Sequence, residues 1–242
     1  MICLQATTRE IVLILEFMIS IFGDSYVDPC SGQLQQNKRW YNNLGEPTFI
    51  YGLAGSSIDW SLDNFINGHV ERSGKIIFIE SIPRRFHFEF LKTPRHDAAV
   101  MWGHDWENDK WLSESGMEYH HRHKQFIKHF HKNYKDYHKA TKARCVLKAL
   151  SDQYEKVLYF STSRNFNNYA ALEIQANDKF EIADIILMDA SRGEIIDDYD
   201  PEFRDQRSNH FCEPNHEILS TYIKRKFNNE SVEDIIFEKN LI

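Results

Sequence analysis

The chain has 242 residues, of which 42% are apolar and 14% aromatic, and it carries a formal net charge of −7. This length and apolar content suit one globular domain and exclude a largely disordered chain. The negative balance argues against a general nucleic-acid binder, whose phosphate contacts need a basic surface.

The four cysteines are widely spaced and include no CxxC pair. Their spacing therefore supports neither a disulfide framework nor a structural zinc site. We expect reduced thiols in a cytoplasmic protein, with no metal and no cofactor.

Residues 1–16 are expected to be an extension that need not belong to the native core. The apolar stretch over residues 11–22 contains Glu16, which makes it too charged, as well as too short, for a membrane span. It also lacks the small-residue cleavage site of a signal peptide. Met18 begins a compact apolar strand and is a candidate start of translation. We expect residues 17–242 to form a single domain.

Short apolar runs predict buried strands, and longer amphipathic stretches lie between them. Strands that alternate with helices predict an α/β protein with three α/β/α layers and a mostly parallel central sheet. Ligands bind beyond the carboxyl ends of the strands in such sheets, so the loops that follow the first four strands should share one rim. The strands are expected at residues 17–22, 48–51, 75–80, 157–161 and 182–188.

Residues 58–70 predict a helix with one apolar face, formed by Ile58, Leu62, Phe65 and Ile66. Residues 93–116 show no clear period and contain three tryptophans. We interpret this segment as a long insertion, because loops of that length are uncommon unless they are functional.

Residues 117–154 predict a His- and Lys-rich region of one or two helices. Aromatic side chains recur there at helical spacing and should face the core: Phe126, Phe130, Tyr134 and Tyr137. The opposite face should be solvated and basic: Arg122, Lys124, Lys128, Lys132, Lys135 and Lys139. The six histidines of this region include no pair four residues apart, so they do not predict a helical zinc site.

Gly23-Asp24-Ser25 directly follows the first predicted strand. A glycine at the end of the strand permits a tight turn, which would expose Ser25 at the rim of the sheet. The backbone N–H of this serine would then point towards the oxyanion that forms during acyl transfer. In the alternative interpretation, Asp24 and Ser25 only cap a helix.

The chain resembles the SGNH (GDSL-like) hydrolase family, in particular its divergent phage and bacterial members. Residues 19–25 match the family's first block, an apolar strand followed by GDS. Residues 51–57 are similar to the second block, in which Gly55 takes the place of the glycine whose N–H joins the oxyanion hole. Residues 209–219 fit the last block, where the resemblance implies that His210 is the catalytic base and His216 a packing or capping residue.

Two features depart from the family pattern. The catalytic aspartate of the family stands three residues before the histidine, where this chain has Arg207. Asp205 is the nearest carboxylate; Asp200, or a backbone carbonyl beside a Ser-His dyad, is the alternative.

The third family block, Gly-x-Asn-Asp, is absent, and residues 81–85 resemble instead a Ser/Thr-x-Pro-x-Arg pattern of phage-type relatives. The resemblance then implies that Ser81 and Arg85, together with Asp24 of the first block, belong to the oxyanion or substrate-binding site. In the alternative interpretation, the two arginines of this segment are solvated charges at the end of a strand.

The resemblance implies a flavodoxin-like α/β/α fold and a serine-dependent ester hydrolase that works through an acyl-enzyme. Its substrate would be a small-molecule or glycan ester, such as an O-acetylated carbohydrate. One alternative is a non-catalytic binding protein on the same fold. Another is a binder of polyanions or nucleic acid through residues 120–148. We expect no membrane partner and make no prediction of oligomeric state.

Overall fold

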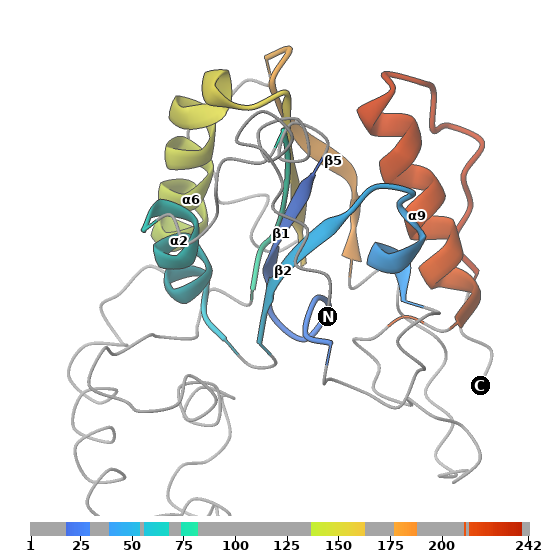
Figure 1. Cartoon of the computed structure of the whole chain (residues 1–242), viewed down its shortest axis with the longest axis horizontal. Helices are drawn as coiled ribbons and strands as arrows, with labels where there is room; N and C mark the ends of the chain where they lie inside the picture. Colours follow the sequence, from blue (N-terminus) through green and yellow to red (C-terminus); the bar gives the residue numbers. More distant parts are fainter. Residues whose placement is uncertain are drawn as a thin grey trace, which may run out of the picture.

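The computed structural model describes residues 18–29, 39–53, 56–67, 74–81, 137–162, 177–187, 211 and 213–238. Its centre is a parallel sheet of five strands in the order β2-β1-β3-β4-β5, seen in Figure 1. The predicted parallel sheet is therefore confirmed, with strand ends that differ from the prediction by two residues or fewer. The strands are β1 (Ile19–Gly23), β2 (Thr48–Gly52), β3 (Lys75–Ile79), β4 (Lys156–Ser161) and β5 (Phe180–Ile186).

The start of β5 differs from the prediction because a polar side chain sets it. The Oδ1 atom of Asn177 accepts hydrogen bonds from the backbone N–H groups of Lys179 and Phe180, at 2.9 and 2.6 Å. This turn delivers the chain to β4, so that pairing begins with Val157 opposite Phe180. Apolar periodicity does not detect a turn of this kind, and it placed the strand two residues too late.

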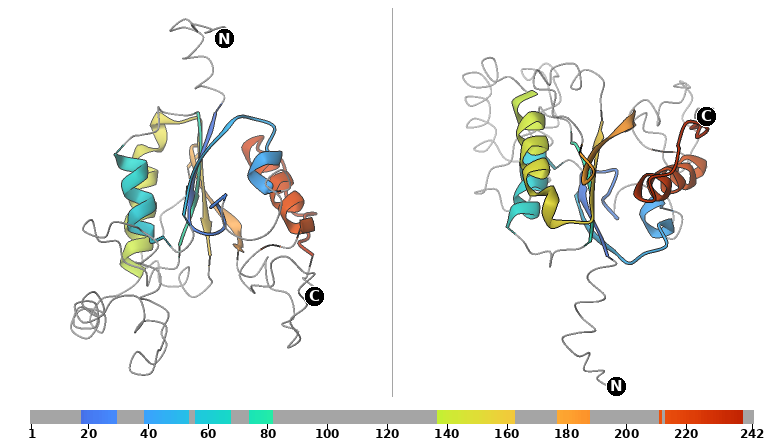
Figure 2. Two further views of the ribbon diagram at one scale, coloured as in Figure 1. Left: turned by 60° about the horizontal axis from the view of Figure 1, so that its bottom comes forward. Right: turned by 90° about the horizontal axis from the view of Figure 1, so that it is seen from above.

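Helices cover both faces of the sheet, as Figure 2 shows. On one face lie α2 (Ile58–Ile66) and α6 (Tyr137–Leu150), and α6 is followed by the short 3₁₀ helix η4 (Ser151–Gln153). On the other face lie α9 (Glu213–Phe227) and the 3₁₀ helix η2 (Trp40–Asn43). Among the described helices, none is long and apolar enough to cross a bilayer.

Two hydrophobic clusters, one on each face, hold the layers together. Successive strand residues point to opposite faces, so Ile77 and Ile79 join the cluster beneath α9, while Phe78 joins the cluster beneath α2 and α6. On the latter face, rings stack across neighbouring strands: Phe78 lies 6.3 Å from Phe22 and 5.7 Å from Tyr159, between ring centroids.

Helix α2 confirms most of the predicted apolar face. Ser57 caps the helix, since its Oγ accepts a hydrogen bond from Trp60 N at 3.2 Å. Ile58, Leu62 and Phe65 are buried. Ile66 is 51% exposed, and the predicted burial of this residue is wrong. The helix ends at Ile66, whose position lies at the margin of the apolar stripe, so no part of the sheet covers it.

Lys139 corrects the prediction of a solvated basic face. Its side chain is only 2% exposed, and its Nζ lies 3.4 Å from Asp59 Oδ2 in the first turn of α2. The reason is that α2 and α6 pack side by side, so this position faces a neighbouring helix rather than water. Residues 117–136, with the other cations and most of the aromatic residues predicted for this region, lie outside the described residues, as does the predicted insertion at 93–116.

The carboxyl end of β2 packs tightly against the turn that follows β1. A Cβ added at Gly52 would lie 2.5 Å from the carbonyl carbon of Val27 and 2.6 Å from Asp28 N. Both of these are backbone atoms, which cannot rotate away. Glycine is therefore required at position 52 by the close approach of two segments of main chain.

Gly52→Ala is expected to lower the free energy of unfolding by about 2 kcal/mol, because the methyl group forces the turn away from the sheet. Gly45→Ala is the comparison: an added Cβ there meets nothing within 4 Å, but φ is 84°, so the cost is that of backbone strain alone, about 1 kcal/mol. Urea denaturation of both variants measures the difference. Equal losses at the two positions would contradict the contact described for Gly52.

Candidate active site

Ser25 is the second residue of a tight turn at the carboxyl edge of the sheet, but it is only 6% exposed, so the predicted exposure of its side chain is wrong. The backbone carbonyl of Asp24 accepts hydrogen bonds from the N–H groups of Val27 and Asp28, at 3.0 and 2.9 Å. The Asp24 side chain also holds this turn, since its Oδ1 accepts from Tyr26 N at 3.3 Å. This contact belongs to the turn itself and is not the helix cap considered for the motif, since no helix begins within residues 24–29.

Gly23 lets the turn approach the sheet. A Cβ at this position would lie 2.7 Å from Val27 Cγ2 and 3.0 Å from Ile79 Cβ at the end of β3. The Gly23 carbonyl accepts hydrogen bonds from Leu53 N and from Ser56 Oγ, both at 3.3 Å. Two residues of the loop that follows β2, Leu53 and Ser56, therefore bind the first residue of the GDS motif. Gly55, the predicted oxyanion residue of that loop, lies outside the described residues.

Phe211, which belongs to the segment predicted to be the last family block, contacts the same turn. The ring of Phe211 lies 5.3 Å from the ring of Tyr26, between centroids. The residue that follows His210 thus contacts the residue that follows Ser25. His210 itself, with Asp205 and Asp200, lies outside the described residues.

His216 has the packing and capping role expected for it. Its Nδ1 accepts a hydrogen bond from Trp40 N at 3.3 Å, and its ring lies 5.6 Å from that of Phe211. The imidazole therefore joins α9 to η2 and to the residue that follows His210.

A buried polar network joins the ends of β3 and β4 to α6. Glu80 Oε2 accepts hydrogen bonds from Tyr159 OH at 2.6 Å and from Arg144 Nη2 at 3.0 Å. Arg144 Nη2 also donates to Ser161 Oγ at 2.9 Å, and its guanidinium lies 5.0 Å from the centroid of the Tyr159 ring. Sequence reasoning missed this network. The only signal for it was an acidic residue at the end of an apolar strand.

Burial dominates the electrostatics of this network. It raises the pKa of the Glu80 carboxyl above its usual value, while the positive charge of Arg144 and the hydrogen bonds from Tyr159 and Arg144 oppose that shift. Burial, followed by the negative charge of Glu80, raises the pKa of the Tyr159 hydroxyl well above its usual value. The phenol therefore stays protonated and donates to the carboxylate.

Ser81 directly follows Glu80 and is fully buried. Within the part of the chain that the structure describes, its Oγ has no hydrogen-bond partner. An unpaired buried hydroxyl is rare in folded proteins and calls for an explanation, which a bound ligand can supply. Arg85, the other site residue predicted in this loop, lies outside the described residues.

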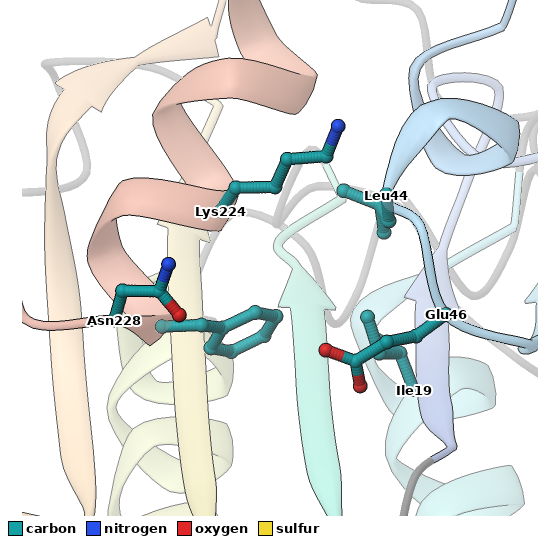
Figure 3. Close-up of a pocket in the computed structure, with 6 residues that line it drawn as sticks. Ile19, Leu44, Glu46, Lys224 and Asn228 are labelled. Carbon is teal, nitrogen blue, oxygen red and sulfur yellow. The ribbon is translucent and has the colours of Figure 1, made fainter.

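A cavity of about 200 Å³ opens at the opposite edge of the sheet (Figure 3). It is bounded by the first residue of β1 and the end of α9, and it is lined by Ile19, Leu44, Glu46, Lys224, Phe227 and Asn228. Because it lies at the amino ends of the strands, it is remote from Ser25 and Ser81. Within the described ranges, no group of three or more His, Cys, Asp or Glu side chains is arranged to hold a metal ion.

Arg144→Leu is expected to lower the free energy of unfolding at pH 7 by about 3–5 kcal/mol, because it leaves the Glu80 carboxylate buried without its cation. Loss of the positive charge raises the pKa of Glu80 further. A carboxyl with a higher pKa in the folded than in the unfolded protein binds more protons when folded, so its unfavourable contribution grows as pH rises above the unfolded value. The stability difference from wild type should therefore shrink between pH 7 and pH 5.

Denaturation at the two pH values measures this change. The double variant Arg144→Leu with Glu80→Gln is the control, and it should recover most of the loss at pH 7. A difference from wild type that is the same at pH 5 and pH 7 would show that Glu80 does not cause the effect.

No protein-family model and no curated protein matches the sequence. Solved structures that are similar to the chain include a putative lipolytic protein of the G-D-S-L family from Desulfitobacterium hafniense DCB-2. The two sequences are 10% identical and the TM-score is 0.44, and the match covers 86% of this chain and 98% of that one. Another is a catalytic mutant of an acetylxylan esterase from Geobacillus stearothermophilus, at 9% identity and a TM-score of 0.49, over 87% and 93%.

Proposed function

We propose that the protein is a serine-dependent ester hydrolase that forms an acyl-enzyme on Ser25. The observation that carries the proposal is the placement of Ser25 in a tight turn at the carboxyl edge of a parallel sheet. Both sides of this turn are held by hydrogen bonds, at Asp24 and at Gly23. A serine in such a turn presents its hydroxyl where ligands bind in α/β sheets, which supports a nucleophilic role.

The proposed reaction has two steps. His210 takes the proton of Ser25 while the Oγ attacks the ester carbonyl, and the alcohol leaves with a proton from His210. Water, activated by the same imidazole, then attacks the acyl-enzyme and releases the acid. Asp205 orients His210 in this scheme; Asp200 or a backbone carbonyl is the alternative.

The oxyanion would be held by the N–H groups of Ser25 and Gly55. We assign the third donor, an asparagine in the resembled family, to the Ser81 hydroxyl. Two observations support this assignment: β3 is the neighbour of β1 in the sheet, and Ser81 Oγ has no hydrogen-bond partner within the described residues. A donor that is already desolvated and fixed in place stabilises a developing negative charge strongly.

We propose a small acyl ester as substrate, and an O-acetyl group on a carbohydrate as the natural form of it. The tryptophans of residues 93–116 would supply rings on which a sugar could stack, and Arg85 would bind an oxyanion or an acidic substituent. The polyanion alternative has less support, because Lys139 and Arg144 of the basic region are buried and paired with Asp59 and Glu80. Their charges therefore do not add to a surface patch.

Ser25→Ala is expected to abolish both labelling by a fluorophosphonate probe and hydrolysis of p-nitrophenyl acetate, because it removes the attacking oxygen. In-gel fluorescence and nitrophenol release measure the two. Ser61→Ala is the control, since Ser61 is also a buried serine but lies on α2, and it should keep both signals. Labelling that persists in Ser25→Ala would rule out the nucleophile, and a wild-type protein that shows neither signal would favour a non-catalytic binding protein.

Ser81→Ala is expected to lower kcat for p-nitrophenyl acetate by about 100-fold, as the loss of one oxyanion donor does in acyl transfer. KM should change little, because the donor acts mainly in the transition state. The thermal midpoint should not fall, since the hydroxyl has no partner within the described residues. A kcat equal to that of wild type would exclude Ser81 from the oxyanion site.

A further inference from the structure

Three hydroxyl side chains follow the carboxyl ends of three adjacent strands, and the first of them lies in the turn after β1. β1 pairs with β3 up to Phe22 opposite Phe78, and β3 pairs with β4 up to Ile79 opposite Phe160. Ser25, Ser81 and Thr162 each lie two residues further along the sequence than Gly23, Ile79 and Phe160, the residues near the ends of these three strands. The carboxyl edge of the sheet therefore carries a row of hydroxyls, of which Thr162 has no role in the proposed reaction.

Thr162 has the same unusual environment as Ser81. Its side chain is buried, and its Oγ1 has no hydrogen-bond partner within the described residues. A hydroxyl in such a place has lost its contacts with water and gained none in return. Valine has nearly the same shape and would avoid this cost. A group that binds to the hydroxyl explains why a polar residue is tolerated at this position.

The buried network holds this end of β4 in place. Ser161, the residue before Thr162, accepts a hydrogen bond from Arg144, and Arg144 also binds Glu80, the residue before Ser81. Glu80 N in turn donates to the carbonyl of Phe160 at 2.9 Å, which extends the ladder between the two strands beyond Ile79. The Arg144 guanidinium thus binds both Glu80 and Ser161, the residues that precede the two hydroxyls. Because strand pairing continues to Glu80, the sheet and this guanidinium together fix the spacing between Ser81 and Thr162.

The position of Thr162 in the row limits what it can bind. Adjacent strands lie about 4.8 Å apart, so the end of β4 lies about 10 Å from the line of β1. Thr162 directly follows β4, and that distance is too great for a hydrogen bond to the oxyanion formed at Ser25. Ser81, which follows the intervening strand β3, is better placed to reach the oxyanion. A polar atom held by Thr162 must belong to a part of the substrate several bonds away from the scissile carbonyl.

We propose that Thr162 is a substrate-binding residue that hydrogen-bonds a hydroxyl group on the alcohol part of the ester, and so selects esters of polyhydroxylated alcohols. This inference rests on the proposed hydrolase activity and adds to it the residue that recognises the alcohol. A threonine hydroxyl both donates and accepts a hydrogen bond, which suits an alcohol hydroxyl.

The test uses two esters with the same acyl group and the same number of carbon atoms in the alcohol: 1-O-acetylglycerol, which has two additional hydroxyls, and n-propyl acetate, which has none. Acetate release gives kcat/KM for both substrates in wild type, Thr162→Val and Thr162→Ser. The wild-type protein should prefer the glycerol ester. Thr162→Val should lose about tenfold in kcat/KM on that ester, as expected for one hydrogen bond, and nothing on n-propyl acetate.

Thr162→Ser keeps the hydroxyl and should retain most of the preference. Ser61→Ala should behave as wild type, since it removes a buried hydroxyl on α2 that also has no hydrogen-bond partner within the described residues. Thermal unfolding checks that Thr162→Val is folded. An equal loss on both esters, or no loss on either, overturns the role of Thr162 while leaving the hydrolase intact. Absence of hydrolysis of both esters by wild type, with Ser25 unlabelled, overturns the hydrolase itself and this inference with it.

Discussion

The turn that follows β1 lies closer to the ends of β2 and β3 than any side chain at Gly23 or Gly52 would allow. A Cβ at either glycine would lie within 2.7 Å of an atom of Val27 or Asp28. This approach brings Ser25 to the edge of the sheet and leaves the Gly23 carbonyl to hold the loop that follows β2. The proposed nucleophile and oxyanion loop therefore depend on two close approaches to the turn, one at Gly23 and one at Gly52, and each requires glycine.

Buried polar side chains also lie at the same edge of the sheet. Glu80 and Arg144 form a buried ion pair, which costs desolvation that its hydrogen bonds only partly recover. Ser81 and Thr162 add two buried hydroxyls that have no partner within the described residues. Proteins break the rules of polar satisfaction mainly at functional sites, which is consistent with substrate binding at this edge.

The sequence was sufficient to predict the parallel sheet, because buried strands such as β3 and β4 are continuous apolar runs. It also placed Ser25 directly after a strand, since Gly23-Asp24-Ser25 is a local signal. Lys139 and the Glu80–Arg144 pair could not be predicted, because each depends on which helix face meets which neighbour across the chain. Helical periodicity predicts that lysine and arginine side chains face water. Only the packing of α6 against α2 and β4 shows that Lys139 and Arg144 are buried.

The register of the strands adds information that no single motif contains. Ser25 and Ser81 belong to separate predicted elements, and Thr162 was not singled out in the sequence. The parallel pairing of β1, β3 and β4 brings the segments that contain these residues to the same edge of the sheet. Their alignment gives each hydroxyl a different distance from the reacting carbonyl. The proposed roles therefore follow the order of the strands β1, β3 and β4 along the edge: catalysis at Ser25, oxyanion binding at Ser81 and recognition of the alcohol at Thr162.

A crystal structure of the protein after reaction with a methyl fluorophosphonate tests the central claim most directly, because the adduct mimics the tetrahedral intermediate. We expect the phosphorus atom to be bonded to Ser25 Oγ. One non-bridging oxygen should lie within hydrogen-bond distance of the Ser25 and Gly55 N–H groups and of Ser81 Oγ, with the His210 imidazole beside Ser25 Oγ. An adduct on another residue, or an oxygen directed away from these donors, would contradict the account.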